Sequence, residues 1–402
     1  MMQRPYSKAV VSAKAERYLR QHHPWVYNTD ILLAPESAVN GDLVDVVTEK
    51  GRWMGTGFYN SNSKLALRVV SRNTNDRFDR AFWQRRVRYA LQYRKTVMPG
   101  EDFRCCRLIH GEADGFPGLT VDRYGEILVA QCQCLGLDRI KQEIYDALLA
   151  QLRDAGESIQ GLYERNDGPL RAKEGLPSEK GFYAGTGSGS CLIRENGLEL
   201  LVDYENGQKT GYFLDQKRNR QAVARLAAGR SVLDCFAHTG GFGLNCAAAG
   251  AKRVVCVDVS QAALDTAGKN AALNHLHPEF LCQDVFVLLD SLSLGNAKPF
   301  DLIILDPPAF TKSRGTLRSA LRGYREINRK AMRLLPRGGY LATCSCSHFV
   351  TDALFCEMLR AAAMDADVTL KQVEARQQSP DHPIDWDVPE TSYLKFYIFQ
   401  VC

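Results

Sequence analysis

Short apolar runs separated by turn residues occupy the first part of the chain. They predict strands over Asp42–Thr48, Met54–Tyr59 and Leu65–Val70, with Asn60–Ser63 as the turn between the last two. Several short strands in so small a segment are typical of a small barrel. We therefore expect a β-barrel domain over residues 1–73.

Residues 74–185 mix helical and strand patterns. Apolar residues at helical spacing predict helices over Phe82–Val97 and Ile140–Leu152, and Arg107–Gln131 between them predicts strands joined by glycine turns. Closely spaced glycines in Arg171–Ser190 indicate a loop. We place a domain boundary in that loop.

Strands and helices alternate over residues 186–402, which is the pattern of a parallel sheet covered by helices. A glycine loop and a helix reaching about Ala249 follow the first strand. Strands are predicted at Ser231–Cys235, Arg253–Asp258, Glu279–Cys282, Leu302–Leu305, Tyr340–Ser345, Val368–Ala375 and Tyr393–Val401, and further helices at Gln261–Asn274, Leu317–Leu335 and Thr351–Ala363.

The composition is ordinary for a soluble globular protein, with 402 residues of which 45% are hydrophobic and 24% charged. No apolar run approaches the roughly 20 residues that span a membrane, and Met1–Arg20 lacks the apolar core of an export signal. The 13 cysteines are spread along the chain, and no pair of Cys-x-x-Cys motifs completes a metal site. We expect a cytoplasmic protein with reduced thiols and no metal.

The net charge of +5 is small, but basic residues gather in two runs. Arg77–Lys95 holds seven basic residues and one acid, and Lys312–Arg337 holds nine basic residues and one acid. Such runs can neutralise the phosphates of a nucleic acid, and each can equally be the solvated face of a helix. Charge alone does not distinguish RNA from DNA.

The first candidate for chemistry is the segment Val232–Phe242, where a buried strand ends in Asp234 and a tight glycine turn opens a helix. Glycines let a ligand approach the backbone, and a helix N-terminus favours an anion. The next strand ends in Asp258, which suits a ribose diol. The spacing differs from that of dinucleotide enzymes, which argues against an NAD-dependent oxidoreductase. The strand, the glycine turn and the acid after the next strand together predict a nucleotide-like cofactor. A strand–turn–helix that binds no ligand is the alternative.

Two more acids follow the next two strands, Asp284 after Glu279–Cys282 and Asp306 after Leu302–Leu305. Because the carboxyl ends of parallel strands share one edge of a sheet, we expect the four acids to line one ligand-binding rim. One such acid could simply cap a helix, but four in series favour a site. Two prolines follow Asp306 and stiffen a turn that can hold its carboxylate against a flat base; a plain turn is the alternative.

Two cysteines, Cys344 and Cys346, lie at the end of the strand Tyr340–Ser345. Residues two apart face the same side of a strand, so both thiols are expected to point together, with Thr343, Ser345 and Ser347 on the other side. Cys346 is nearer the acidic rim, where a thiolate could attack an electron-poor ring carbon. For Cys344 we favour a small buried thiol.

Six motifs, in their order along the chain, resemble the bacterial large-subunit ribosomal RNA methyltransferase I family. Members of that family are class I S-adenosylmethionine-dependent enzymes that make 5-methylcytidine in 23S rRNA. The motifs are His23-Pro-Trp-Val26, Gly111-Glu-x-Asp-Gly-x-Pro-Gly118, Lys209-Thr-Gly-Tyr-Phe-Leu-Asp-Gln216, Thr239-Gly-Gly241, Asp306-Pro-Pro308 and Ser345-Cys-Ser347.

The resemblance implies an RNA-binding PUA domain over residues 1–73, a central α+β domain over 74–185 and a seven-stranded Rossmann-like methyltransferase domain over 186–402. It implies S-adenosylmethionine as cofactor and ribosomal RNA, 23S above all, as partner; a homodimer stays open. It makes Cys346 the nucleophile and Asp306 the residue that orients the cytosine. The implied cofactor site comprises Phe213, Gln216, Asp234, Phe236, Thr239, Gly240, Asp258 (on the ribose) and Asp284 (on the adenine amino group).

The expected function is rRNA methylation that forms 5-methylcytidine through a covalent adduct between Cys346 and cytosine. Asp306-Pro-Pro-Ala-Phe310 also resembles the motif of enzymes that methylate base amines. An rRNA guanine N2 or N7 methyltransferase without a thiol nucleophile is therefore one alternative, and a non-catalytic RNA-binding assembly factor is another. The target nucleotide, the form of the substrate and the group that removes the C5 proton stay open.

Overall fold

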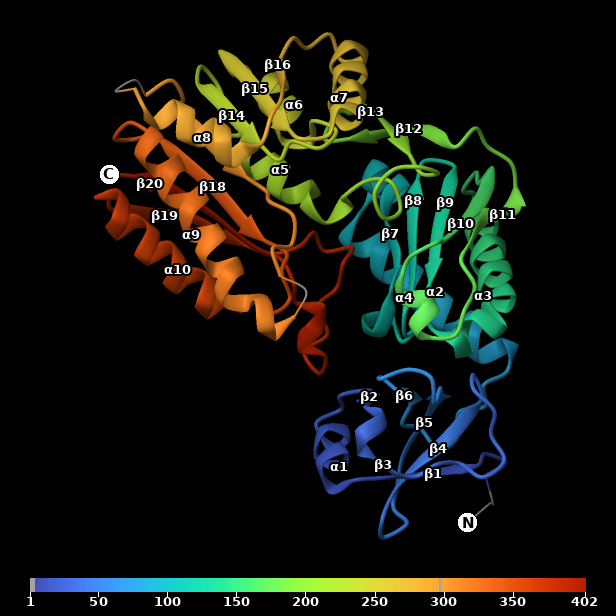
Figure 1. Ribbon diagram of the computed structural model, residues 1–402. Helices are drawn as coiled ribbons and strands as arrows, with labels where there is room; N and C mark the ends of the chain where they lie inside the picture. The colour runs from blue at the N-terminus through green and yellow to red at the C-terminus, as the bar shows by residue number, and fades with distance from the viewer. Residues whose placement is uncertain (1–3, 296–297, 312) are drawn as a thin grey trace. The chain divides into compact units, whose positions relative to one another are not determined.

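The structure, a computed structural model, describes residues 4–295, 298–311 and 313–402. Lys312, the first residue of the second basic run, and residues 1–3 of the expected barrel lie outside the described residues. The chain forms two compact units (Figure 1). The first holds the described residues up to Ile193 with Val202–Leu214 and Pro380–Thr391, and the second holds Arg194–Leu201, Asp215–Ser379 and Ser392–Cys402.

The N-terminal part of the first unit is a six-stranded sheet with the strand order β2-β6-β5-β4-β1-β3. The three predicted strands are confirmed with shifts of one or two residues at their ends, and apolar residues of β4 such as Val44 and Val46 build its core. The elements are β1 (Lys8–Val11), α1 (Ala13–Arg20), β2 (Trp25–Val26), β3 (Ile31–Leu33), β4 (Leu43–Thr48), β5 (Trp53–Tyr59) and β6 (Leu67–Ser71).

The first unit continues with a five-stranded sheet of order β11-β10-β9-β8-β7. Both predicted helices are confirmed, as α2 and α3, and their apolar faces share a core with this sheet. The elements are α2 (Arg80–Val97), β7 (Cys105–His110), β8 (Leu119–Tyr124), β9 (Ile127–Cys132), α3 (Leu135–Asp154), β10 (Gly161–Asn166), α4 (Leu170–Lys173) and β11 (Glu179–Gly185).

The loop that we expected over Arg171–Ser190 is wrong in part, because β11 lies inside it and pairs antiparallel with β10. Gly181 and Gly185 have positive φ values of 156° and 73°. The glycines of this segment are typical of a loop in sequence, whereas the partner strand β10 supplies the hydrogen bonds that make the segment a strand. The three-domain division stays a prediction; its boundary after residue 73 falls inside the first unit.

The second unit is built on a seven-stranded sheet of order β16-β15-β14-β17-β18-β20-β19, in which only the pairs formed by β20 are antiparallel. Five strands, β14 to β18, have the predicted bounds. The sequence pattern missed α5 and α8. The sheet and its helices are α5 (Lys217–Ala224), β14 (Ser231–Cys235), α6 (Gly241–Ala248), β15 (Arg253–Asp258), α7 (Gln261–Leu273), β16 (Glu279–Cys282), α8 (Val285–Ser293), β17 (Leu302–Leu305), α9 (Leu317–Leu334), β18 (Tyr340–Ser345), α10 (Asp352–Ala366), β19 (Leu370–Arg376) and β20 (Lys395–Val401).

Two separate hydrophobic cores cover the two faces of this sheet. Helices α8, α9 and α10 pack on one face, and α5 and α6 pack on the other (Figure 1). Neighbouring residues of one strand divide between the cores, with Leu233 in the first and Val232 in the second. This burial on both faces explains why the strands are continuous apolar runs that the sequence pattern located well.

The remaining strands, β12 (Ser190–Glu195) and β13 (Leu198–Asp203), form a two-stranded sheet. All 13 cysteines are free thiols. Among the residues that the structure describes, no cluster of metal-ligating side chains occurs and no helix is both long and apolar enough to cross a membrane.

Candidate active site

A strained loop joins β14 to α6 at the carboxyl edge of the sheet. Phe236 and His238 adopt left-handed backbone conformations with φ of 64° and 51°, and Gly240, the residue before α6, has φ of 85°. Such conformations cost non-glycine residues on the order of 1–3 kcal/mol each and occur most often at functional sites. The glycine turn that opens a helix is confirmed, and its strain marks this edge as a candidate site.

Asp234 lies in β14 and is fully buried. Its Oδ2 accepts a hydrogen bond of 2.7 Å from the backbone N–H of Gly243, where a Cβ would come within 2.3 Å of the Cys256 sulfur. Its Oδ1 accepts no hydrogen bond from any described residue. Burial, with repulsion from Asp306 and Asp258, raises the pKa of Asp234 to about 8. Three of the four acids therefore lie close enough to interact.

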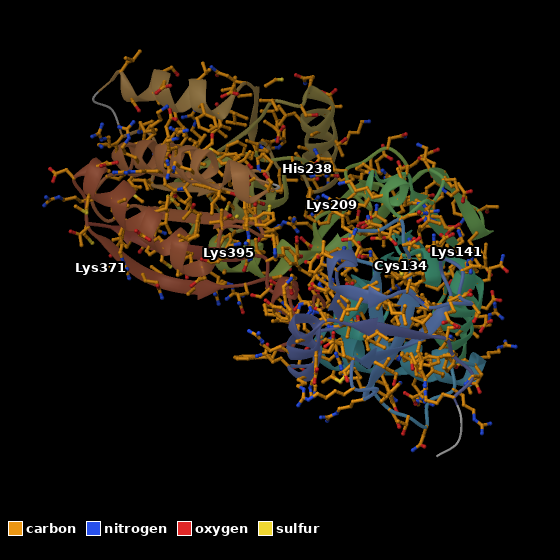
Figure 2. All side chains as sticks on the ribbon, turned by 60° about the horizontal axis from the view of Figure 1, so that its bottom comes forward. Cys134, Lys141, Lys209, His238, Lys371 and Lys395 are labelled. Atoms are coloured by element: carbon orange, nitrogen blue, oxygen red, sulfur yellow. The ribbon has the colours of Figure 1, made fainter. Side chains whose placement is uncertain are left out.

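Asp258 ends β15, and its carboxylate holds the strained loop. Oδ2 accepts a hydrogen bond from the backbone N–H of His238 and Oδ1 accepts one from that of Ser260, both at 2.9 Å. Burial lowers the pKa of His238 to about 4, so its imidazole is neutral at pH 7 (Figure 2). The sequence reasoning missed His238, whose signal was its position inside the glycine-loop motif.

Asp284 follows β16 and is exposed. Its Oδ1 accepts hydrogen bonds from the backbone N–H groups of Phe286 at 2.7 Å and Val287 at 3.3 Å, so it caps α8. Helix capping, which was the alternative role for any one of the four acids, therefore occurs at Asp284. Its second oxygen, Oδ2, accepts no hydrogen bond from the described part of the chain.

Asp306 follows β17, and its Oδ1 accepts two side-chain hydrogen bonds. Gln216 donates through Nε2 at 3.1 Å and Cys344 donates through its sulfur at 2.9 Å. The amide of Gln216 is oriented in turn by Asn219, whose Nδ2 donates to Gln216 Oε1 at 2.7 Å. Burial raises the pKa of Asp306. The hydrogen bonds donated by Cys344 and Gln216 favour the charged carboxylate and oppose this shift.

The two cysteines at the end of β18 pack against the same hydrophobic cluster, which confirms that they face one side of the strand. Ser345 and Ser347 face the other side, where each hydroxyl lies 3.0 Å from the Tyr324 hydroxyl. Cys344 is fully buried, and burial raises the pKa of its thiol well above the ordinary value. Cys346 is only partly buried. Of the two cysteines, Cys346 is therefore the more exposed.

The other predicted site residues divide between the two units. Phe236, Thr239 and Gly240 belong to the loop after β14, where the carbonyl of Thr239 accepts a hydrogen bond of 3.2 Å from Asn270. Phe213 belongs to the first unit, where the ammonium of Lys209 lies 4.8 Å from the centre of its ring (Figure 2). All the predicted site residues except Phe213 therefore belong to the second unit.

Two family models match this chain. The model described as S-adenosylmethionine-dependent methyltransferase matches residues 177–400, and the model described as PUA-like domain matches residues 10–72. The first range contains the acidic rim and both cysteines, and the second contains most of the six-stranded sheet. The fold class expected from the sequence is thereby confirmed.

Known proteins are similar over nearly the whole chain. The ribosomal RNA large subunit methyltransferase I of Aeromonas salmonicida (strain A449) is 39% identical over 384 residues, which cover 94% of this chain and 96% of that protein. A S-adenosylmethionine-dependent methyltransferase structure from Streptococcus mutans and a methyltransferase structure complexed with SAH each have a TM-score of 0.82 at 21% identity, with coverage of 98% of this chain and 100% of theirs. These structures show that the fold is shared.

Proposed function

Because this chain belongs to the S-adenosylmethionine-dependent methyltransferases, in the family of ribosomal RNA large subunit methyltransferase I, we propose that it methylates ribosomal RNA and forms 5-methylcytidine in 23S rRNA. Two observations support this chemistry. Cys346 is only partly buried, and it lies two positions after Cys344 in the chain. The thiol of Cys344 donates a hydrogen bond to Asp306, a carboxyl group whose pKa is raised by burial. The PUA-like domain and the exposed basic residues of the two runs would hold the surrounding RNA, because phosphate contacts position a substrate without specifying its sequence. Arg94 of the first run and Lys330 of the second are buried and pair with acids of this chain instead.

Carbon 5 of cytosine is a poor nucleophile, and a thiolate overcomes this barrier by covalent catalysis. The sulfur of Cys346 forms a bond to C6, and the displaced ring electrons make C5 able to accept a methyl group. S-adenosylmethionine, when bound, supplies that methyl group as an electrophile. Loss of the C5 proton then restores the double bond and expels the Cys346 thiolate. The cytosine must leave its stack to reach the thiol.

Asp306 is proposed to act at N3 of the ring, the atom that receives the displaced electrons. When the thiolate adds to C6, negative charge develops on the ring at N3, and a proton on Asp306 Oδ2 can be donated there. Gln216 and Cys344 hold Oδ1, so the protonated oxygen has a defined direction. Such preorganised donors stabilise the charge without rearrangement during the reaction.

The residues of the second unit fit S-adenosylmethionine. The N-terminus of α6 offers a close backbone approach, and the carboxylate of Asp258 is a partner for hydroxyl groups. The buried Asp234 adds a polar atom, Oδ1, that has no hydrogen-bond partner among the described residues. We assign the ribose to Asp258 and the adenine amino group to Asp284. The other proposed cofactor-binding residues are Phe213, Gln216, Phe236, Thr239 and Gly240.

Replacing Asp258 with alanine is expected to weaken S-adenosylmethionine binding about 10- to 150-fold, because hydrogen bonds to a charged group are worth about 1.5–3 kcal/mol. Isothermal titration calorimetry with S-adenosylmethionine measures the affinity. Asp265→Ala, which removes an exposed acid of α7, is the matched control and should bind as wild type. Equal affinity for the Asp258 and Asp265 variants would contradict the assignment.

The proposed function is tested by incubating the protein with S-adenosylmethionine and deproteinised 23S rRNA, and by digesting the RNA for nucleoside mass spectrometry. We expect one new methylated nucleoside, 5-methylcytidine. Methylguanosine would overturn the cytosine assignment in favour of a guanine methyltransferase. RNA binding without methyl transfer, under reducing conditions with bound cofactor, would favour a non-catalytic assembly factor.

A further inference from the structure

Tyr324 is a fully buried tyrosine of α9 whose hydroxyl contacts both serines that flank Cys346. Helix α9 packs on the face of the sheet that the two serine side chains share (Figure 1). The Ser345 hydroxyl donates a hydrogen bond of 3.0 Å to the Tyr324 hydroxyl, which lies 3.0 Å from the hydroxyl of Ser347. Because the Tyr324 oxygen accepts from Ser345, its own proton is left for Ser347. One hydroxyl therefore holds both serines.

Two further hydrogen bonds hold the backbone around Cys346. The backbone N–H of Ser347 donates to the Ser345 hydroxyl at 3.3 Å, in the pattern by which a serine stabilises a turn. The carbonyl of Ser347 accepts a hydrogen bond of 2.9 Å from the ammonium of Lys395. These contacts lie on the serine side of the strand and act on the backbone on both sides of Cys346. They thereby set the direction in which its side chain leaves the chain.

The ring of Tyr324 connects this turn to the loop that carries Asp306. Phe310, four residues after Asp306, packs on the ring with the two ring centres 4.5 Å apart, and Phe355 of α10 packs on it edge to face at 5.8 Å. Burial raises the pKa of Tyr324 to about 12, so its hydroxyl stays protonated at neutral pH. One side chain therefore contacts both the turn of the proposed nucleophile and the loop of the proposed proton donor.

We propose that Tyr324 is a positioning residue that holds the Cys346 thiol at a fixed place relative to Asp306 during methyl transfer. The inference rests on the proposed function, in which Cys346 bonds to C6 and Asp306 donates to N3. Both atoms belong to one flat, rigid ring, so the sulfur and the carboxyl group must be held at matching positions before the base enters. Misplacing a reacting group by about 1 Å can lower a rate about 10²-fold.

The test is Tyr324→Phe, which removes the hydroxyl and keeps the ring that packs on Phe310. With saturating RNA and S-adenosylmethionine, we expect the single-turnover rate of methyl transfer to fall about 10- to 100-fold. The affinities for S-adenosylmethionine and for 23S rRNA should stay at their wild-type values, because Tyr324 is assigned no contact with either. A wild-type rate for Tyr324→Phe would overturn the proposal.

Tyr397→Phe is the matched control. Tyr397 is another buried tyrosine of the same core that also packs on Phe355, and its hydroxyl donates to Asp352 of α10 at 2.6 Å. Removing this hydroxyl should leave methyl transfer at the wild-type rate. If Tyr397→Phe caused the same loss as Tyr324→Phe, a general loosening of the core would explain both results and the proposal would fail.

A triple variant separates positioning from stability. Tyr324→Phe leaves the hydroxyls of Ser345 and Ser347 without their shared partner, and unpaired buried polar groups are costly. Adding Ser345→Ala and Ser347→Ala removes these groups, so the melting temperature should recover toward the wild-type value while methyl transfer stays low. Recovery of the rate together with the melting temperature would assign Tyr324 a purely structural role.

A measurement without RNA tests the hold on the turn independently of the proposed function. Hydrogen exchange followed by mass spectrometry reports how firmly the backbone amides of residues 345–350 are held. They should exchange faster in Tyr324→Phe than in wild type and in Tyr397→Phe, and equal exchange would refute the proposal. If Tyr324→Phe does not fold, Ser347→Ala, which removes one of the two serine hydroxyls, should show a smaller change in the same direction. Absence of 5-methylcytidine from the wild-type methylation assay would refute the proposed function and leave this result standing.

Discussion

Replacing Cys346 with alanine is expected to lower methyl transfer to 23S rRNA by at least about 10³-fold, because the substitution removes the sulfur that forms the bond to C6 in the proposed reaction. The measurement is transfer of a radiolabelled methyl group to deproteinised 23S rRNA under single-turnover conditions, which report the chemical step. Binding of S-adenosylmethionine should stay within a few-fold of wild type, because Cys346 is assigned no contact with the cofactor. Turnover near the wild-type rate would exclude the covalent route.

The matched control for this prediction is Cys344→Ser. A serine hydroxyl keeps a donor for Oδ1 of Asp306, and the buried sulfur that it replaces is held in the protonated form. Methyl transfer by Cys344→Ser should therefore stay within about tenfold of wild type, since it removes no reacting atom. If Cys344→Ser were inactive and Cys346→Ala active, the nucleophile would be the other thiol.

Replacing Asp306 with asparagine should lower kcat by about 10²–10³-fold, the usual loss for one preorganised donor or general acid. Asparagine can accept the hydrogen bonds of Gln216 and Cys344 through its Oδ1, so the pocket should keep its packing. It cannot transfer a proton to N3. Single-turnover rates for wild type and Asp306→Asn, measured across pH, test this expectation.

The direction in which the rate changes with pH distinguishes proton donation by Asp306 from simple hydrogen bonding. Burial raises the pKa of Asp306, and the reactive form is the protonated one, so the wild-type rate should fall as pH rises through that pKa. Asp306→Asn should lack this alkaline decline. An Asp306→Asn variant with the wild-type rate would show that hydrogen bonding at this position suffices.

Much of the second unit could be predicted from the sequence because its strands are buried on both faces. Residues such as Val232 and Leu233 enter different cores, so the central strands β14, β15 and β17 are continuous apolar runs, whereas the edge strands β16 and β19 are mostly exposed. The glycine loop, the acids at the strand ends and the alternation that puts Cys344 and Cys346 on one side are also local features. The segment 179–185 was wrongly predicted to be a loop, because the strand β11 forms only through its hydrogen bonds with β10.

The chain alone thus determined which residue types stand at the carboxyl edge of the sheet, since strand period and strand order place them there. Tertiary structure decided what each one does. The backbone N–H of His238 donates a hydrogen bond to Asp258 at the end of the next strand. The cap that Asp284 forms on α8 is, by contrast, a local contact that the sequence left open as one interpretation. Lys395 of β20 stands opposite Ser345 of β18, from which it is far apart in sequence, because the two strands pair antiparallel. Burial and long-range pairing set the protonation states of such groups, and no local pattern records them.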